Sequence, residues 1–371
     1  MTKIVFTQFQ NVELIVENGN PIGGAVVETL VWIKALHELG YEIIQFSEEN
    51  DQRKPSQEYM WIQFLPVYHP SKGIRWLRWV FYRFPKIFAA LKKSKPDYLY
   101  SSIPGWASFF IAVFCKILGI KMILRVASDS HVYVETGDLT THSRFDRAFI
   151  FRAYMAADFI SVQNEFQYQT LRKRFPSKKI LKIYNPIVIE EANQSKKAEM
   201  TGYIAWIANF RYPKNLKLLF EVAKEFPDEE FNIAGVASSS MDIETKEYLG
   251  RLKLLPNVVF AGKVPREEIF IFLSQAKFLL STSKYEGFSN TFLEAMVVGT
   301  PILTPTWVNP DGIINRFDLG ITYENVAELK EKIEELTLEK YLKKSANCNQ
   351  FVKNNHDHLV LGRKLVEFLN E

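Results

Sequence analysis

Residues 283–294 read Ser-Lys-Tyr-Glu-Gly-Phe-Ser-Asn-Thr-Phe-Leu-Glu, and Ala-Met-Val-Val-Gly-Thr-Pro follows them directly. This stretch predicts the end of a strand, a turn at Gly287 and a helix that begins near Thr291. The free amides and the dipole of such a helix start suit a phosphate group. A capping box formed by Thr291 and Glu294 is the alternative interpretation, but it gives no role to Glu286 or to the loop.

Short apolar runs alternate with helix-period segments on both sides of this stretch. The alternation predicts βαβ units around parallel sheets, so the fold class is α/β. In the first half we expect six strands in one open sheet, near Lys3–Thr7, Tyr41–Phe46, Tyr98–Ser101, Lys121–Val126, Asp158–Val162 and Lys179–Tyr184. In the second half we expect strands near Tyr203–Ala208, Glu230–Ala234, Asn257–Ala261, Lys277–Leu280 and Pro301–Thr304.

The polar residues 186–200 lose this periodicity and predict an exposed linker. We therefore expect two Rossmann-like domains, at residues 1–189 and 190–355, with a last helix near 356–371 that packs back on the first domain. Ligands of parallel sheets bind outside the carboxyl ends of the strands. The two domains are accordingly expected to face each other across a cleft.

The composition excludes several classes of protein. Apolar residues make up 47% and charged residues 24% of the chain, which excludes a disordered or fibrous protein. Cys115 and Cys348 are the only cysteines, so we expect no disulfide framework and no metal site. The amino terminus lacks the features of a signal peptide and no apolar run is long enough to span a membrane, which predicts a cytoplasmic protein. No Gly-x-Gly-x-x-Gly follows a strand, which disfavours a nicotinamide dehydrogenase.

The stretch at 283–294 resembles the E-x7-E motif of glycosyltransferase family 4, and the residues after it resemble that family's continuation. Members of the family are retaining, metal-independent sugar-nucleotide transferases of GT-B fold, which has two facing Rossmann-like domains. The resemblance implies that Glu286 contacts the hydroxyls of the donor sugar and that Glu294 holds the ribose hydroxyls. It also implies that loop residues bind the sugar and the diphosphate, namely Gly287, Phe288, Ser289 and Asn290.

A second segment, Trp-Ile-Ala-Asn-Phe-Arg-Tyr-Pro-Lys-Asn, follows the first strand of the second domain. The family has an Arg and then a Lys here, and both grip the diphosphate. Lys214 matches the Lys, whereas Asn209 occupies the usual Arg position and Arg211 follows two residues later. Fixed cations of this kind stabilise the negative charge of a leaving diphosphate without a metal. Lys263 and Val264 lie where the family recognises the nucleotide base, largely through backbone groups.

The first domain offers weaker candidates. In Asn-Pro-Ile-Gly-Gly-Ala, Gly23 and Gly24 resemble the glycine loop that faces the donor in this family, although a plain turn explains them equally well. Glu28, one turn into the following helix, is a candidate acceptor contact. Asp129 and His131 are candidates for contact with the sugar or for acceptor deprotonation. The His-Asp pair of the family is not reproduced in register, and both residues also fit an ordinary loop.

Residues 72–95 carry eight Lys or Arg side chains, no Asp or Glu, and several aromatic rings. This composition predicts a peripheral contact with an anionic membrane surface. The candidate contact residues are Arg75, Trp76, Arg78, Trp79 and Arg83. A helix whose rings pack on the sheet while its cations are solvated is the alternative. Nucleic acid is not an expected partner, because no RNA- or DNA-binding motif accompanies these residues.

The sequence thus predicts a retaining glycosyltransferase that moves a sugar from a nucleoside diphosphate to a hydroxyl of a glycan or lipid-linked acceptor. Bacterial-type surface polysaccharide or glycolipid assembly is the expected setting. We expect no cofactor beyond the sugar-nucleotide substrate. The alternatives are a sugar-nucleotide epimerase of the same fold and a catalytically silent protein that binds nucleotide or membrane.

Overall fold

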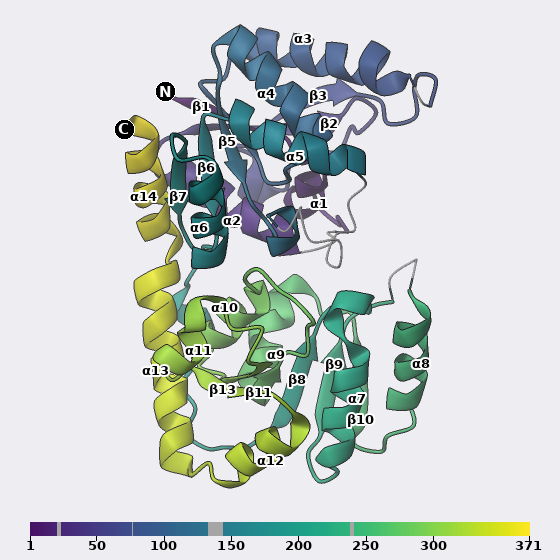
Figure 1. The fold of residues 1–371 in the computed structure, drawn as a ribbon, viewed down its shortest axis with the longest axis vertical. Helices are drawn as coiled ribbons and strands as arrows, with labels where there is room; N and C mark the ends of the chain where they lie inside the picture. The colour runs from purple at the N-terminus through teal and green to yellow at the C-terminus, as the bar shows by residue number, and fades with distance from the viewer. Residues whose placement is uncertain (21–23, 76, 133–143, 238–240) are drawn as a thin grey trace. The chain divides into compact units, whose positions relative to one another are not determined.

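The structure is a computed structural model that describes residues 1–20, 24–75, 77–132, 144–237 and 241–371 (Figure 1). The predicted Gly23 and Trp76 lie outside the described residues. The chain divides into two compact units: Met1–Pro186 with His358–Glu371, and Ile187–Asp357. Each unit is built on its own parallel sheet.

In the described part of the first unit, seven parallel strands form one sheet in the order β3-β2-β1-β4-β5-β6-β7. Their bounds are β1 Lys3–Phe6, β2 Glu42–Glu48, β3 Gln63–Tyr68, β4 Tyr98–Ser101, β5 Lys121–Arg125, β6 Phe159–Val162 and β7 Lys179–Lys182. Successive side chains of a strand point to opposite faces. On β1, Ile4 and Phe6 therefore pack on one side with α2 (Gly24–Glu38) and α14 (His358–Asn370), whereas Val5 packs on the other.

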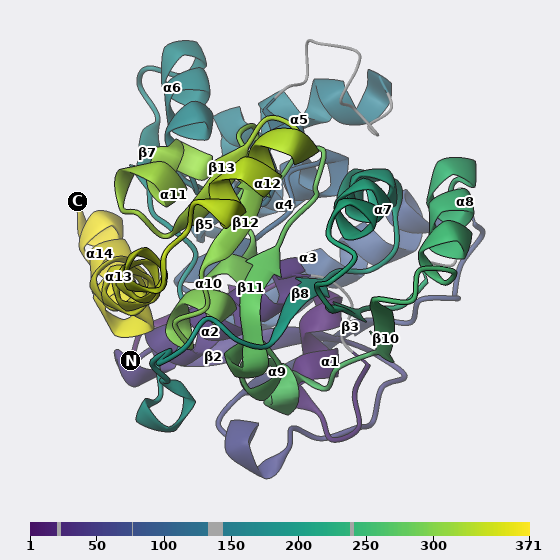
Figure 2. The same cartoon turned by 90° about the horizontal axis from the view of Figure 1, so that it is seen from below.

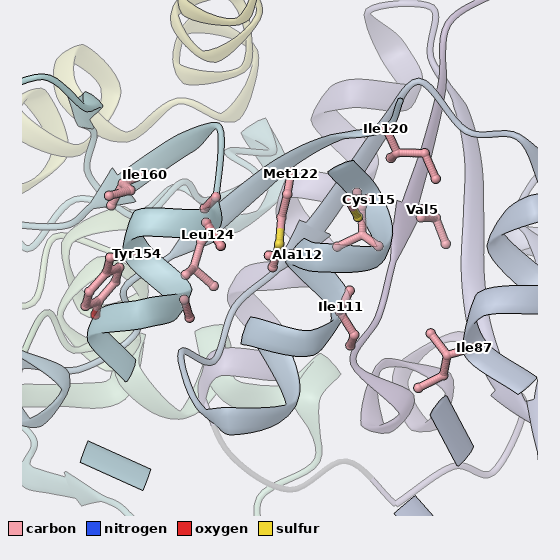
Figure 3. Close-up of a cluster of buried hydrophobic side chains, with 14 of the residues drawn as sticks. Val5, Ile87, Ile111, Ala112, Cys115, Ile120, Met122, Leu124, Tyr154 and Ile160 are labelled. Carbon is pink, nitrogen blue, oxygen red and sulfur yellow. The ribbon is translucent and has the colours of Figure 1, made fainter. Parts of the chain in front are cut away.

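The Val5 side of the sheet is covered by α3 (Phe84–Ser94), α4 (Trp106–Leu118) and α5 (Arg144–Ala156). Figure 3 shows this core, in which Met122 and Leu124 of β5 lie near Ala112 of α4. Shorter elements of the unit are η1 Phe9–Asn11, α1 Val12–Ile15, η2 Gln57–Tyr59, η3 Trp79–Arg83, η4 Asp129–His131 and α6 Glu165–Arg174.

In the described part of the second unit, six parallel strands follow the order β10-β9-β8-β11-β12-β13. Their bounds are β8 Tyr203–Ile207, β9 Phe231–Ala234, β10 Val258–Gly262, β11 Ala276–Leu280, β12 Ile302–Pro305 and β13 Gly320–Tyr323. Figure 2 shows α7 and α9 on opposite sides of β8 and β11. The helices are α7 Leu216–Glu225, α8 Ile243–Leu252, α9 Ile269–Gln275, α10 Asn290–Val297, α11 Ile313–Arg316, α12 Val326–Glu334 and α13 Leu338–His356, with short turns η5 Glu191–Asn193, η6 Tyr212–Lys214, η7 Arg266–Glu268 and η8 Pro310–Gly312.

Both sheets have one strand more than the sequence pattern predicts, and both extra strands are edge strands. β3 contains Pro66, which an edge position tolerates because one side of the strand makes no ladder hydrogen bonds. β13 begins at Gly320, where an added Cβ would lie 1.9 Å from the carbonyl oxygen of Ile302. Only glycine allows this close approach to β12.

The predicted exposed linker is exposed at residues 190–192, 196, 198 and 199, but other residues of it are anchored on the second unit. Ile187 is buried and its amide donates to the carbonyl of His356 at 2.8 Å. Ser195 Oγ donates to the carbonyl of Val298 at 2.8 Å, and Lys197 Nζ donates to the carbonyl of Ala276 at 2.7 Å. None of the described helices combines the length and apolar character that crossing a lipid bilayer requires.

Candidate active site

The loops that follow the two central strands of the second sheet are tied to each other. β8 and β11 are adjacent and parallel, so their carboxyl ends lie at the same edge of the sheet. Trp206 Nε1 donates to Thr282 Oγ1 at 3.0 Å, and Thr282 Oγ1 donates to the carbonyl of Lys214 at 2.8 Å. The amide of Lys284 donates to the carbonyl of Pro213 at 2.8 Å. These bonds hold the two predicted motifs side by side.

The structure brings Lys214 and Glu286 into direct contact. Lys214 Nζ forms an ion pair with Glu286 Oε2, and Ser283 Oγ lies 3.3 Å from the same oxygen. Both charged side chains are mostly buried but keep some exposure to solvent. Lys214 ends η6, and Asn215 then caps α7 by accepting a hydrogen bond from the amide of Leu218 at 3.3 Å. A cation and a carboxylate are therefore fixed at the edge of the sheet within reach of a ligand.

Glu294 is buried in α10 and pairs with a residue that the sequence analysis did not single out. Its Oε1 accepts a hydrogen bond from Arg266 Nη1 at 2.5 Å. The Arg266 side chain is more than one-third exposed and belongs to η7, after β10. The capping-box alternative is wrong: α10 begins at Asn290 and its first turn has Ser289 as N-cap with no side-chain cap bond. The carboxylate of Glu294 instead faces a cation.

The loop at residues 287–290 is anchored by the aromatic side chain of Phe288. Gly287 and Phe288 are buried, and the Phe288 ring lies 5.0 Å from the ring of His356, centroid to centroid. Ser289 and Asn290 are half-buried, and Ser289 Oγ lies 2.8 Å from Thr291 Oγ1. Phe288 thus fixes the backbone of the loop with its side chain.

The other predicted donor residues of the second unit lie at the same edge of the sheet. Arg211 is exposed. Burial raises the pKa of Tyr285, and the positive charge of Arg211 acts on the same pKa in the opposite direction. Asn209 is half-buried in the loop after β8. Lys263 is exposed and Val264 half-buried, after β10. Arg211 is therefore close to the Glu286 loop.

In the first unit, the predicted polar residues are held by the protein itself. Asp129 Oδ1 accepts hydrogen bonds from Asn164 Nδ2 at 3.0 Å and from Gln167 Nε2 at 2.7 Å. His131 is buried in η4, and Gly24 is exposed as the first residue of α2. Asp129 therefore fastens η4 to the start of α6.

Glu28 is not an acceptor contact, because it is buried in an ion pair. Its Oε1 lies 2.8 Å from Arg125 Nε and accepts a hydrogen bond from Trp32 Nε1 at 3.1 Å. Arg125 is fully buried and also donates to Ser161 Oγ at 2.8 Å and to Asn185 Oδ1 at 2.7 Å. This network joins α2, β5, β6 and the segment after β7.

The basic stretch is partly packed and partly exposed. Arg78 Nη1 and Arg83 Nη2 donate to the carbonyl of Pro70 at 3.0 and 2.8 Å. The Arg83 guanidinium lies 4.6 Å from the Trp79 ring centroid, and Trp79 packs edge-on against Trp106 at 4.8 Å. Arg75 is exposed. For Trp79, the packed-ring alternative describes the structure.

Comparison with known proteins places both units in one class. The family model described as "Glycosyltransferase Family 4" matches residues 22–191, and the model described as "Glycosyl transferases group 1" matches residues 188–355. The "Glycosyltransferase 1 domain-containing protein 1" of Xenopus tropicalis is 25% identical over 154 residues, which are 40% of this chain. The alignment spans only 45% of that relative.

Solved structures of other proteins resemble the whole chain, and two of them illustrate this. Sucrose-phosphate synthase from Thermosynechococcus elongatus is 14% identical, with a TM-score of 0.77 over 100% of this chain and 98% of that one. Anabaena Alr3699/HepE, solved in complex with UDP-glucose, is 15% identical, with a TM-score of 0.76 over 100% of both chains. These similarities confirm the predicted GT-B fold. The two matched family models together span residues 22–355, and the chain therefore belongs to the glycosyltransferases, with a domain that matches the Glycosyltransferase Family 4 model followed by a domain that matches the group 1 model.

Proposed function

We propose that the chain transfers a sugar from a nucleoside diphosphate to a hydroxyl group with retention of configuration. The observation that carries this proposal is the contact between Lys214 and Glu286 at the carboxyl ends of β8 and β11. UDP is the first nucleotide to test, because the similar Anabaena protein was solved with UDP-glucose.

In the proposed donor complex, the Lys214–Glu286 pair exchanges partners, whereas the Arg266–Glu294 pair stays in place. The diphosphate takes the ammonium of Lys214, with Arg211 as a second cation, and this frees the Glu286 carboxylate to accept hydrogen bonds from sugar hydroxyls. Glu294 accepts from the ribose hydroxyls through one oxygen while Arg266 holds the other. Charged hydrogen bonds of this kind are stronger than neutral ones. The loop amides of 287–290 would face the sugar and the diphosphate.

The chemical step follows from this placement. Lys214 and Arg211 stabilise the negative charge that develops on the departing diphosphate, and a transition-state interaction of this type lowers the barrier without a metal or a resident cofactor. We propose that the acceptor hydroxyl attacks from the face that the diphosphate leaves, with the leaving phosphate taking the hydroxyl proton. Retention is the stereochemical result.

We also propose that the acceptor is a glycan or a lipid-linked glycan at the inner face of a membrane, in polysaccharide or glycolipid assembly. The support is the exposed apolar and basic part of the 72–95 stretch, where Ile74, Val80 and Phe81 are exposed. Arg75 is exposed in the same stretch, and Lys86 is exposed while it pairs with Glu49. Apolar tips combined with cations suit an anionic headgroup region. Flotation with anionic vesicles at low salt tests this, and a Phe81→Glu variant that floats as well as the wild type would contradict it.

Thermal unfolding with added nucleotides tests the donor site. A ligand that binds only the native state raises the unfolding midpoint. We expect one of UDP, GDP or ADP to raise the midpoint of the wild type, and we expect neither CMP nor NAD to do so. The increase should disappear in Glu294→Ala and persist in Glu247→Ala, which removes an exposed carboxylate of the same unit. The proposal fails if every nucleotide leaves the midpoint unchanged or if Glu294→Ala responds like the wild type.

A further inference from the structure

The first unit contains a pocket of about 390 Å³ that the donor chemistry does not use. It lies where the loops after β1 and β4 meet η3 and the start of α4. Its volume falls within the roughly 300–1,000 Å³ of small-molecule sites. Five aromatic residues contribute to its lining: Phe9, Phe46, Tyr68, Trp79 and Trp106.

The aromatic walls are fixed by packing against one another and against the core. Phe9 and Tyr68 pack with ring centroids 4.9 Å apart. Ile87 and Ile111 line the pocket and also belong to the hydrophobic core of the unit (Figure 3). Side chains held in this way keep their positions without a ligand, which lowers the entropic cost of binding.

The lining contains one charged residue, Asp146, among mainly apolar side chains, and this composition favours an apolar occupant over a sugar ring. Ser102 Oγ donates to Gln8 Oε1 at 2.5 Å, and Ser108 Oγ donates to the carbonyl of Gly105 at 2.8 Å. A hydroxyl has one proton to donate, and here the protein itself receives it. A sugar needs several hydrogen-bonding groups that converge on it, whereas a hydrocarbon gains by leaving water for an apolar wall.

A residue of the pocket lining is followed directly in the sequence by exposed apolar residues. Trp79 lines the pocket and begins the π-helical turn η3, whose next two residues, Val80 and Phe81, are 60% and 73% exposed. Arg83 ends the turn and stacks on the ring of Trp79. The η3 turn therefore carries one residue of the pocket lining, two exposed apolar side chains and a cation. A lipid whose hydrocarbon chain leaves the membrane and enters the pocket would contact all three.

We propose that this pocket binds the hydrocarbon chain of a lipid-linked acceptor, at the part of the chain next to its head group. The proposal rests on the proposed glycosyl transfer and specifies the substrate class. It makes the acceptor a single-chain amphiphile. Free glycans would then be poorer acceptors than the same glycan on a chain.

Displacement of the neutral fluorescent probe N-phenyl-1-naphthylamine tests the pocket. We expect one probe to bind per chain. Octyl glucoside should displace it below its micelle concentration and 1-octanol below its solubility limit, and dihexanoylphosphatidylglycerol should displace it less well. No probe binding would overturn the proposal. If the two-chain phosphatidylglycerol displaces the probe best, the pocket takes a bilayer lipid and the acceptor assignment is wrong.

Two variants locate the probe. Ile103 lines the pocket and is 51% exposed, so Ile103→Asp places a charge in the lining at little cost in folding. Gly105→Leu fills space, because an added Cβ at Gly105 meets no atom within 4 Å. Ile117→Asp, at a 66% exposed residue of α4 outside the lining, is the matched control. We expect Ile103→Asp and Gly105→Leu each to weaken probe binding about tenfold or more, because an apolar ligand would have to desolvate the new charge or would lose the space that the leucine fills. The control should bind the probe like the wild type.

Nucleotide stabilisation measured on the same variants separates the two proposals. Normal nucleotide binding with equal probe affinity in all variants would refute the pocket and leave the donor site standing. If Ile103→Asp and Gly105→Leu weaken probe binding but no nucleotide stabilises the protein, the apolar pocket is supported and the proposed sugar transfer is refuted.

Discussion

The Arg125 pair of the first unit and the two pairs at the candidate donor site of the second unit hold their positive charges in opposite ways. In the first unit, Arg125 is fully buried, and the carboxylate that neutralises it, Glu28, is buried as well. In the second unit, Glu294 is the buried partner and Arg266 approaches it from the exposed side. Lys214 and Glu286 both keep some exposure. The first arrangement is closed on all sides, whereas the second is open to a ligand.

This difference is the one that we expect between a structural ion pair and a pair that exchanges a partner with a ligand. Taking both charges of a pair out of water is costly, and the cost is offset only when each charge keeps good partners. Arg125 has Glu28, Ser161 and Asn185, so no ligand is needed to complete the set. A pair that remains partly hydrated can exchange a partner for a phosphate or a sugar hydroxyl at little cost. The open pairs are accordingly the candidates for donor binding.

The largest effect is expected from breaking the closed pair. Glu28→Gln leaves the Arg125 guanidinium buried without its counter-charge, and loss of one member of a buried pair costs about 3–5 kcal/mol. Urea unfolding should show this loss in the free energy of unfolding. Glu58→Gln removes one member of the exposed Lys34–Glu58 pair and should cost less than about 1 kcal/mol. Similar losses in the two variants would mean that the Arg125 network is not a closed structural pair.

Removal of an open cation should affect ligand binding more than stability. Lys214→Met is expected to weaken binding of the stabilising nucleoside diphosphate roughly 10–100-fold, because a hydrogen bond to a charged group contributes about 1.5–3 kcal/mol. Calorimetric titration measures the affinity. Lys277→Met is the matched control, because Lys277 also forms a mostly buried pair, with Glu229, but on a strand of the same unit. An equal loss of affinity in both variants would show that Lys214 acts through the fold alone.

A smaller effect is expected at Arg266, which we propose positions Glu294. Arg266→Gln keeps a hydrogen-bond donor but removes the charge, so nucleotide affinity should fall about 3–10-fold, or about 0.7–1.4 kcal/mol. Glu294→Gln should lose more, because the carboxylate itself would contact the ribose. Nucleotide titration of the two variants gives the order. Greater loss in Arg266→Gln would reverse the roles that we assign.

The sequence predicts the central strands of both sheets better than their edges. Central parallel strands such as β1 and β11 are buried on both faces and therefore appear as continuous apolar runs. β3 and β13 escape notice because Pro66 and Gly320 are residues that usually interrupt strands. Proline and glycine are tolerated here because both strands lie at sheet edges. The order of strands in a sheet is a tertiary property, however, and the local sequence pattern does not contain it.

The candidate site was predictable where a motif exists and not where a contact joins distant segments. The two motifs pointed to Lys214, Glu286 and Glu294, whose roles in donor binding stay predictions. Arg266 and the pairing of Glu28 with Arg125 have no local signal, because each residue alone resembles a solvated surface charge. Only the fold shows that their partners lie within hydrogen-bond distance.

Lys197 extends the comparison to a cation that is held by carbonyl groups. Its ammonium donates to the carbonyls of Ser274 and Ala276, and burial lowers its pKa from 10.5 to about 8. Between these pH values the unfolded chain binds the proton and the folded chain releases it, so the free energy of unfolding rises with pH. The wild type should gain about 1 kcal/mol relative to Lys197→Met between pH 7 and 9, after allowance for solvent screening. Urea unfolding at both pH values measures this, and a constant difference would mean that carbonyl groups hold the charged form of a lysine as well as a carboxylate does.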